Sequence, residues 1–177
     1  MKMILISAGH TNIKGLDQGA AGNGFIEGVE AVKLRDATAA YLRELNKDIK
    51  VIEDGFDNDN QPLTKAIALA KTANFAIEFH FNAGPPAATG IEVLSKPNKK
   101  TFSQKIAGAI HNATDLVLRG ESGWKADNSG QHHRLGFCEA GGVIVEVGFI
   151  SNASDMKAYK SNFEAICKGI AEVLANL

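Results

Sequence analysis

The sequence has no long apolar run, almost no cysteine and no surplus of either charge. No apolar run reaches the roughly 18 residues that a membrane span requires, so we expect no membrane partner. Two cysteines, Cys138 and Cys167, are too few for a disulfide framework in a chain of 177 residues, and we expect buried thiols. The net charge of −1 gives no support for a nucleic-acid partner.

The amino-terminal sequence MKMILISAGH also lacks the features of a secretory signal. The apolar run after Lys2 is shorter than the roughly 7–15 residues of a signal-peptide core, and no small-residue cleavage site follows it. We therefore expect synthesis in the cytoplasm without a signal peptide, and another route to any target beyond the membrane.

Strand-like and helix-like patterns alternate along the chain. Its 45% apolar and 22% charged residues are typical of one globular domain with a sizeable core. The expected strands cover residues 2–7, 49–54, 75–84, 89–95 and 141–149. The expected helices cover residues 26–46, 62–71, 101–116 and 161–177, with a short one beginning at residue 151. This alternation predicts an α/β fold: a single domain over residues 1–177, with a central twisted, mostly parallel or mixed sheet and helices on both faces.

Local signals refine these boundaries. Thr101 with Gln104, and Ser161 with Glu164, have the spacing of helix-capping pairs. The loop GFDNDNQP is rich in aspartate but lacks the spacing and final glutamate of a calcium-binding EF-hand, so we interpret it as a solvated turn. Its three aspartates are Asp54, Asp57 and Asp59. Residues 119–139 show no clear pattern.

The segment FAIEFHFNAG, from Phe75 to Gly84, has two unlike faces when it is read as a strand. Its phenylalanines and an isoleucine alternate on one face, as in a strand packed on a core. Glu78, His80 and Asn82 lie on the other face. Either that face is in contact with water, or its polar groups bind something.

Four polar residues are expected to gather at one edge of the sheet. Ligands of open α/β sheets bind beyond the carboxyl ends of the strands. His10 follows the first strand, His80 lies near the end of its strand, and Glu146 lies late in the strand GGVIVEVGF. Glu27 opens the first long helix, after a glycine-rich loop that begins at His10 and can fold back toward it.

Two histidines and a carboxylate suit a catalytic zinc with one position left for water, and a further carboxylate suits a general base. Taken singly, His10, Glu27 and His80 also fit ordinary roles in a loop, a helix start and a strand. Glu146 fits such a role less easily, because an unpartnered buried charge is costly. The same ligand set suits non-haem iron, but the fold and Glu146 favour hydrolysis.

Five segments of the chain resemble a known family. They are ISAGHTN, GAAGNGFIEG, FHFNAG, TGIEVL and VIVEVGFISN. Together they resemble, in order and over nearly the whole chain, the zinc-dependent N-acetylmuramoyl-L-alanine amidases of the amidase-3 family, found in bacterial wall-remodelling enzymes and phage lysins. VEVGFISN is the most specific. The resemblance implies an α/β fold with one zinc ion, His10, Glu27 and His80 as its ligands, and Glu146 as the catalytic glutamate.

The resemblance also implies a reaction. The reaction is hydrolysis of the amide bond between N-acetylmuramic acid and L-alanine in peptidoglycan by a zinc-activated water. Glu146 would take the water's proton and return it to the leaving amine. Because the sequence shows no signal peptide, we expect a bacteriolytic phage endolysin that acts on the cell wall after release. It would be a monomer, have peptidoglycan as its partner and lack a separate wall-binding domain.

Some residues depart from the family or lie outside its motifs. The family usually has a small serine where this chain has Glu78, which would either accept a hydrogen bond from a ligand histidine or remain a peripheral acid. Asn82 would lie at the edge of the site. His132 and His133 would line the substrate groove or be solvated in their polar loop. Trp124 would stack on a substrate or cover a core edge.

Two other classes of function remain open from the residues. One is a different zinc amide hydrolase or peptidase that acts on wall peptides. The other is a degenerate wall-binding domain without catalysis, which the presence of all four expected site residues disfavours.

Overall fold

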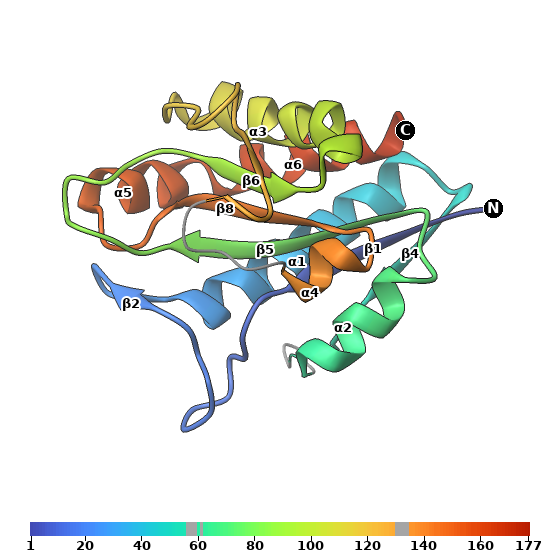
Figure 1. Cartoon of the computed structure of the whole chain (residues 1–177), viewed down its shortest axis with the longest axis horizontal. Helices are drawn as coiled ribbons and strands as arrows, with labels where there is room; N and C mark the ends of the chain where they lie inside the picture. The colour runs from blue at the N-terminus through green and yellow to red at the C-terminus, as the bar shows by residue number, and fades with distance from the viewer. Residues whose placement is uncertain (56–59, 61, 130–134) are drawn as a thin grey trace.

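A mixed sheet of six strands forms the centre of the molecule (Figure 1). The computed structural model describes residues 1–55, 60, 62–129 and 135–177. In the sheet order β4-β1-β5-β8-β6-β7, the first four strands are parallel, while β6 runs antiparallel to β8 and parallel to β7. The strands are β1 (Lys2–Ala8), β4 (Ile49–Glu53), β5 (Phe75–Asn82), β6 (Glu92–Ser95), β7 (Trp124–Ala126) and β8 (Val143–Phe149). The expected mixed α/β sheet is confirmed.

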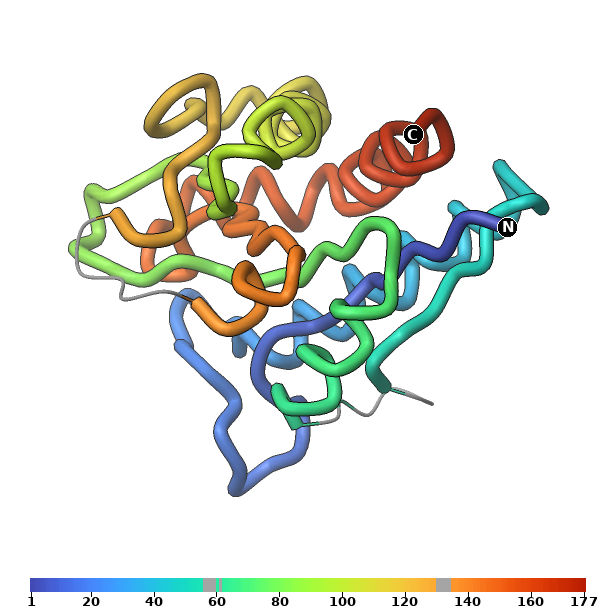
Figure 2. Tube along the Cα trace, turned by 45° about the vertical axis from the view of Figure 1, so that its right-hand side comes forward, coloured from blue at the N-terminus to red at the C-terminus, as the bar shows by residue number. Residues whose placement is uncertain are grey.

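The described helices lie on both faces of this sheet, as expected. Side chains of α1, α3, α5 and α6 join a larger core on one face, and those of α2 and α4 join a smaller core on the other. Figure 2 shows α3 and α6 side by side and the two termini at the same end of the molecule. The helices are α1 (Glu27–Leu45), α2 (Leu63–Ala70), α3 (Lys100–Thr114), α4 (Gly136–Glu139), α5 (Ala153–Ser161) and α6 (Phe163–Ala175), with a 3₁₀ turn η1 (Pro97–Lys99) and a small hairpin of β2 (Ala21–Gly22) and β3 (Phe25–Ile26).

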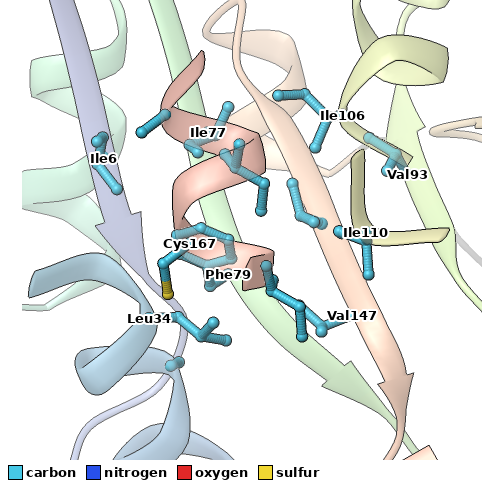
Figure 3. Close-up of a cluster of buried hydrophobic side chains, with 14 of the residues drawn as sticks. Ile6, Leu34, Ile77, Phe79, Val93, Ile106, Ile110, Val147 and Cys167 are labelled. Carbon is cyan, nitrogen blue, oxygen red and sulfur yellow. The ribbon is translucent and has the colours of Figure 1, made fainter. Parts of the chain in front are cut away.

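The larger core is built from alternate residues of the central strands. Ile6, Phe79 and Val147 come from three neighbouring strands and are buried on the same face. They meet Leu34 of α1 and Cys167 of α6 (Figure 3). The phenylalanine face of β5 is therefore a core face, as its alternation predicted.

The opposite face is apolar at one end and polar at the other. Leu5, Ala76, Leu94 and Ile144 are covered by the short helices α2 and α4. Toward the carboxyl ends of β5 and β8 the same face carries polar side chains.

The strand register arranges these polar side chains in two rows. Residues that lie opposite one another on neighbouring strands point to the same face. Ser7 lies opposite Glu78 in one row. In the next, Glu146 lies between His80 and Glu92. The polar face of β5 is thus one part of a polar region that spans four strands.

Both expected helix-capping pairs are wrong. Helix α3 begins at Lys100 without a side-chain cap, and Gln104 instead donates to the carbonyl of Glu121, a residue far along the chain. Helix α6 begins without a side-chain cap, and Glu164 accepts a hydrogen bond from Tyr41. In both cases a tertiary partner holds the side chain that the local spacing assigned to the helix start. The unassigned segment 119–139 contributes the edge strand β7 and helix α4.

Both cysteines are buried thiols without a disulfide partner, as expected. Within the described ranges, none of the helices combines the length and the apolar character that a bilayer crossing requires.

Phe79 provides a test of the larger core, because its ring is fully buried between β5 and the helices. We expect Phe79→Ala to lower the free energy of unfolding by about 3–5 kcal/mol, through lost burial and the cavity that remains. Urea denaturation measures this change. Leu45→Ala, at a side chain that is 53% exposed, is the control and should change stability little. Equal effects of the two substitutions would contradict this assignment of the core.

Candidate metal centre and active site

Two histidines and a glutamate from three distant segments meet at the carboxyl end of β5. His10 follows β1, Glu27 is the first residue of α1, and His80 lies in β5. One potential ligand atom from each of the three lies within 4.8 Å of the other two. The structure therefore brings together the three residues that the sequence suggested as metal ligands.

The loop between β1 and α1 returns to place Glu27 in this group. The backbone N–H groups of Glu27 and Gly28 donate to the carbonyls of Ala20 and Gln18, both at 2.9 Å. The N–H of Ala20 in turn donates to Glu27 Oε2 at 2.9 Å. These reciprocal contacts hold the start of the helix beside the loop that carries His10.

The Glu27 carboxylate lies between the two histidines. Its Oε1 is 3.0 Å from His80 Nδ1 and accepts the backbone N–H of Phe81 at 3.1 Å. Its Oε2 is 3.4 Å from His10 Nε2. Burial alone would raise the pKa of Glu27, but the contacts with both histidines outweigh burial and hold that pKa well below its usual range. Glu27 is therefore ionised.

The second ring nitrogen of each histidine lies beside another carboxylate. His10 Nδ1 lies 3.3 Å from Asp17 Oδ2, and His80 Nε2 lies 3.1 Å from Glu78 Oε1. The contact with Glu27 is the main cause that raises the pKa of His10. Burial would lower the pKa of His80, but its contacts with Glu27 and Glu78 raise it well above the usual value. Of the two roles considered for Glu78, the structure places it against a candidate ligand histidine.

A buried polar network continues behind Glu78. The Ser7 hydroxyl lies 3.0 Å from Glu78 Oε2 and 2.8 Å from Asp54 Oδ2. Asp54 Oδ1 also lies 3.4 Å from Arg35 Nη1, and both side chains are buried. The interpretation of Asp54 as part of a solvated turn is thus wrong, because its side chain is buried against Ser7 and Arg35. Asp57 and Asp59 lie outside the described residues.

Glu146 lies in β8, opposite His80 in the register. Its Oε2 is buried and has no hydrogen-bond partner among the described residues. Burial raises the pKa of the Glu146 carboxyl to about 7; His80 opposes this shift, and the charges of Glu27 and Glu92 add to it. A buried carboxyl with this pKa can take up and release a proton near neutral pH.

The other expected contact residues are less central. Asn82 ends β5 and donates from Nδ2 to Glu92 Oε2 at 3.1 Å. Glu92 lies on β6, on the side of Glu146 that is away from the histidines. The Trp124 indole N–H donates to Ser95 Oγ at 2.9 Å, which ties the ring to the sheet edge. His132 and His133 lie outside the described residues.

Two glycines pack against the histidines, and neither stood out in the sequence. A Cβ on Gly9 would lie 2.1–2.5 Å from three ring atoms of His80. A Cβ on Gly19 would lie 2.5 Å from Glu27 Oε2 and 2.6 Å from His10 Cδ2, and its φ of +73° also favours glycine. Both lie in the glycine-rich loop region, but only the folded contacts show why glycine is required there.

A cavity of about 650 Å³ adjoins His10 and His80. Apolar side chains of Ile13, Leu16 and Leu63 contribute to its lining. The site therefore opens on one side into a space large enough for part of a substrate.

These features define a class of protein. Two histidines and a carboxylate beside a cavity, with a further carboxyl of raised pKa, are the elements of a metal-dependent hydrolase. The Amidase_3 model, described as N-acetylmuramoyl-L-alanine amidase, matches residues 4–176. The chain belongs to this family, and it is an enzyme that hydrolyses the amide bond between N-acetylmuramic acid and L-alanine.

Solved structures agree with this assignment. A Neisseria meningitidis protein provisionally described as an N-acetylmuramoyl-L-alanine amidase is 40% identical, with a TM-score of 0.90 over 99% of this chain and 94% of that chain. The catalytic domain of the CD27L endolysin, which targets Clostridia difficile, shares the fold at 24% identity, with a TM-score of 0.73 over 99% of this chain and 98% of that chain. No curated protein sequence matches the chain.

Gly9 provides a test of the packing around His80. We expect Gly9→Ala to lower the affinity of the candidate site for a divalent metal by about tenfold or more, because the new methyl group displaces the His80 ring and overpacking typically costs about 1–3 kcal/mol. Titration against a chelating indicator measures the affinity. Gly108→Ala in α3 is the matched control, since a Cβ there meets nothing within 4 Å. An unchanged metal affinity in Gly9→Ala would mean that His80 is not a ligand in this position.

Proposed function

We propose that the chain cleaves its amide substrate with one zinc ion held by His10, Glu27 and His80, and that Glu146 transfers the proton. The observation that carries this proposal is the meeting of three ligand atoms within 4.8 Å, next to the strand position of Glu146. Because these residues come from four separate elements, their meeting depends on the whole fold.

The donor set fits zinc. Two imidazole nitrogens and one carboxylate oxygen are a common protein ligand set for catalytic zinc, which keeps a further position open. The nitrogens that face Glu27 are His10 Nε2 and His80 Nδ1, so we assign these as the ligand atoms. The opposite nitrogens face Asp17 and Glu78, which can accept their N–H groups and fix the ring orientations.

Bound zinc would supply a water of lowered pKa and positive charge for the oxygen of the cleaved carbonyl. The Glu146 carboxylate would accept a proton at Oε2, the buried oxygen that has no partner among the described residues. The same group would then return that proton to the leaving amine of L-alanine.

The two described hydrophobic cores lie on opposite faces of one six-stranded sheet, which supports our assignment of residues 1–177 to one catalytic domain. Peptidoglycan is the substrate that family membership supports. The monomeric state and the phage origin stay predictions.

We expect the purified protein to release new L-alanine amino termini from peptidoglycan without new reducing sugar ends, and we expect a chelator to abolish this release. Amino-terminal analysis and a reducing-sugar assay measure the two products. In Glu146→Gln the turnover should fall roughly 10²–10⁴-fold, because the proton carrier is lost, while the zinc content remains.

Glu172→Gln, at an exposed position of α6, is the matched control and should keep full turnover. New reducing ends or cuts within the peptide would reject the amidase assignment. Near-normal turnover in Glu146→Gln would reject only the role of Glu146.

Glu78 provides a separate test of what orients the imidazole ring of His80. We expect Glu78→Gln to weaken zinc affinity by roughly 10–100-fold, because an amide is a weaker acceptor for the His80 N–H than a carboxylate. Competition with a chelating indicator measures the affinity, and nitrogen NMR of His80 reports its tautomer. Glu30→Gln, at a buried carboxylate that contacts Tyr159, is the control. If zinc affinity and tautomer are unchanged in Glu78→Gln, Glu78 does not orient His80.

A further inference from the structure

A charged cluster lies one strand beyond Glu146, on the side away from the histidines. Glu92 of β6 faces Glu146 in the register, so both side chains point to the same face of the sheet. Neighbouring strands are about 4.8 Å apart, which places the cluster within the reach of a substrate that is bound at Glu146. We call Glu92, Arg119 and Lys125 the Glu92 cluster.

The cluster carries one net positive charge. The buried Glu92 Oε1 accepts hydrogen bonds from Lys125 Nζ at 2.6 Å and from Arg119 Nε. Burial would raise the pKa of Glu92, but Lys125 and Arg119 outweigh burial and hold it below the usual range. Two cations therefore share one ionised carboxylate.

Both cations are held in place and yet accessible. Arg119 donates from Nη1 to the carbonyl of Thr89 at 3.1 Å, and its Cζ lies 4.9 Å from the centre of the Phe149 ring. The Arg119 and Lys125 side chains are 35% and 32% exposed. Among the described residues, Glu92 is the one hydrogen-bond acceptor of the Lys125 ammonium, so further N–H donors remain for a ligand.

The two sides of the catalytic row differ in charge. On the histidine side, the acidic residues Asp17 and Glu78 line the cavity beside His10 and His80, together with apolar side chains. A substrate carboxylate would meet these acidic groups there, whereas the Glu92 cluster offers it positive charge and N–H donors. The substrate is asymmetric in the same way, because its sugar is uncharged whereas the stem peptide beyond L-alanine carries carboxylates.

We propose that Arg119 and Lys125 bind a carboxylate of the stem peptide, so that the peptide lies across β8 toward β6 and β7 while the sugar lies toward the cavity beside His10. This inference rests on the proposed function. Lys125 supplies free N–H donors, and Arg119 adds positive charge and fixes Glu92. The two residues select substrates by charge and take no part in proton transfer.

The alternative is that both cations serve only to neutralise Glu92. Arg119 would still neutralise Glu92 in Lys125→Met, so this variant separates the two roles. If Lys125 is merely structural, its replacement would lower kcat/KM equally for all substrates. If Lys125 binds the substrate, the replacement would lower kcat/KM only for substrates that carry the carboxylate.

The experiment compares two soluble N-acetylmuramoyl-tripeptides that differ only in the second peptide residue, which carries a free carboxylate or its amide. We expect the wild-type protein to prefer the carboxylate by about fivefold in kcat/KM, mainly through KM. Lys125→Met should remove this preference and leave turnover of the amide substrate within about twofold. Lys125→Arg should restore the preference, and added salt should weaken it in the wild-type protein.

Lys33→Met is the matched control, since Lys33 contacts the buried Glu30 of α1 at 2.8 Å as Lys125 contacts Glu92. It should keep the wild-type preference, and thermal melting of each variant verifies folding. Equal cleavage of the two substrates by the wild-type protein, or an equal loss on both in Lys125→Met, overturns the carboxylate site and leaves the amidase assignment intact. No cleavage of either substrate by the zinc-loaded wild-type protein overturns the proposed function itself.

Discussion

The Glu27 carboxylate receives contacts from three separate segments: His10 from the loop after β1, Ala20 from just before the β2–β3 hairpin, and His80 and Phe81 from β5. Four positive or hydrogen-donating groups around one buried carboxylate offset the cost of its burial. The same contacts bring both histidines to one point. The loop, the helix start and the central strand are thus coupled through a single side chain, and the candidate metal ligands meet only when all three are in place.

The sheet explains why the site lies on one face and at one end. Helices α1, α3, α5 and α6 pack against one face, whereas within the described part of the chain the short α2 and α4 pack against the amino-terminal part of the other. The carboxyl ends of β5 and β8 are left with room for polar side chains. There the register places His80, Glu146 and Glu92 side by side across three strands. The candidate metal ligands therefore lie at one end of this row and the positively charged cluster at the other.

The sequence predicted the parts of this arrangement that depend on short-range periodicity. Alternation along β5 assigned Phe79 to the core and His80 to the opposite face, and the strand-end rule gathered His80 with His10 and Glu146. The sequence-based prediction failed where a distant residue is the partner. Gln104 donates to the carbonyl of Glu121 and does not cap its helix, and Asp54 is buried against Ser7 and not solvated. The Glu92 cluster depends on the β6–β8 and β6–β7 pairings, and no local pattern marks those pairings.

Glu78 shows how a departure from the family pattern can be accommodated. A buried carboxylate needs several donors, and Glu78 has two, His80 Nε2 and the Ser7 hydroxyl. Ser7 has one hydroxyl proton and also faces Asp54, whose pKa is raised by burial. A proton on Asp54 that is shared with Ser7 would leave the hydroxyl free to donate to Glu78. Glu78 would then accept hydrogen bonds from both groups, keep the proton of His80 on Nε2 and leave Nδ1 for a metal. The buried position of Glu78 thus depends on Ser7, Asp54 and Arg35 behind it, which make this carboxylate the end of a hydrogen-bonded chain.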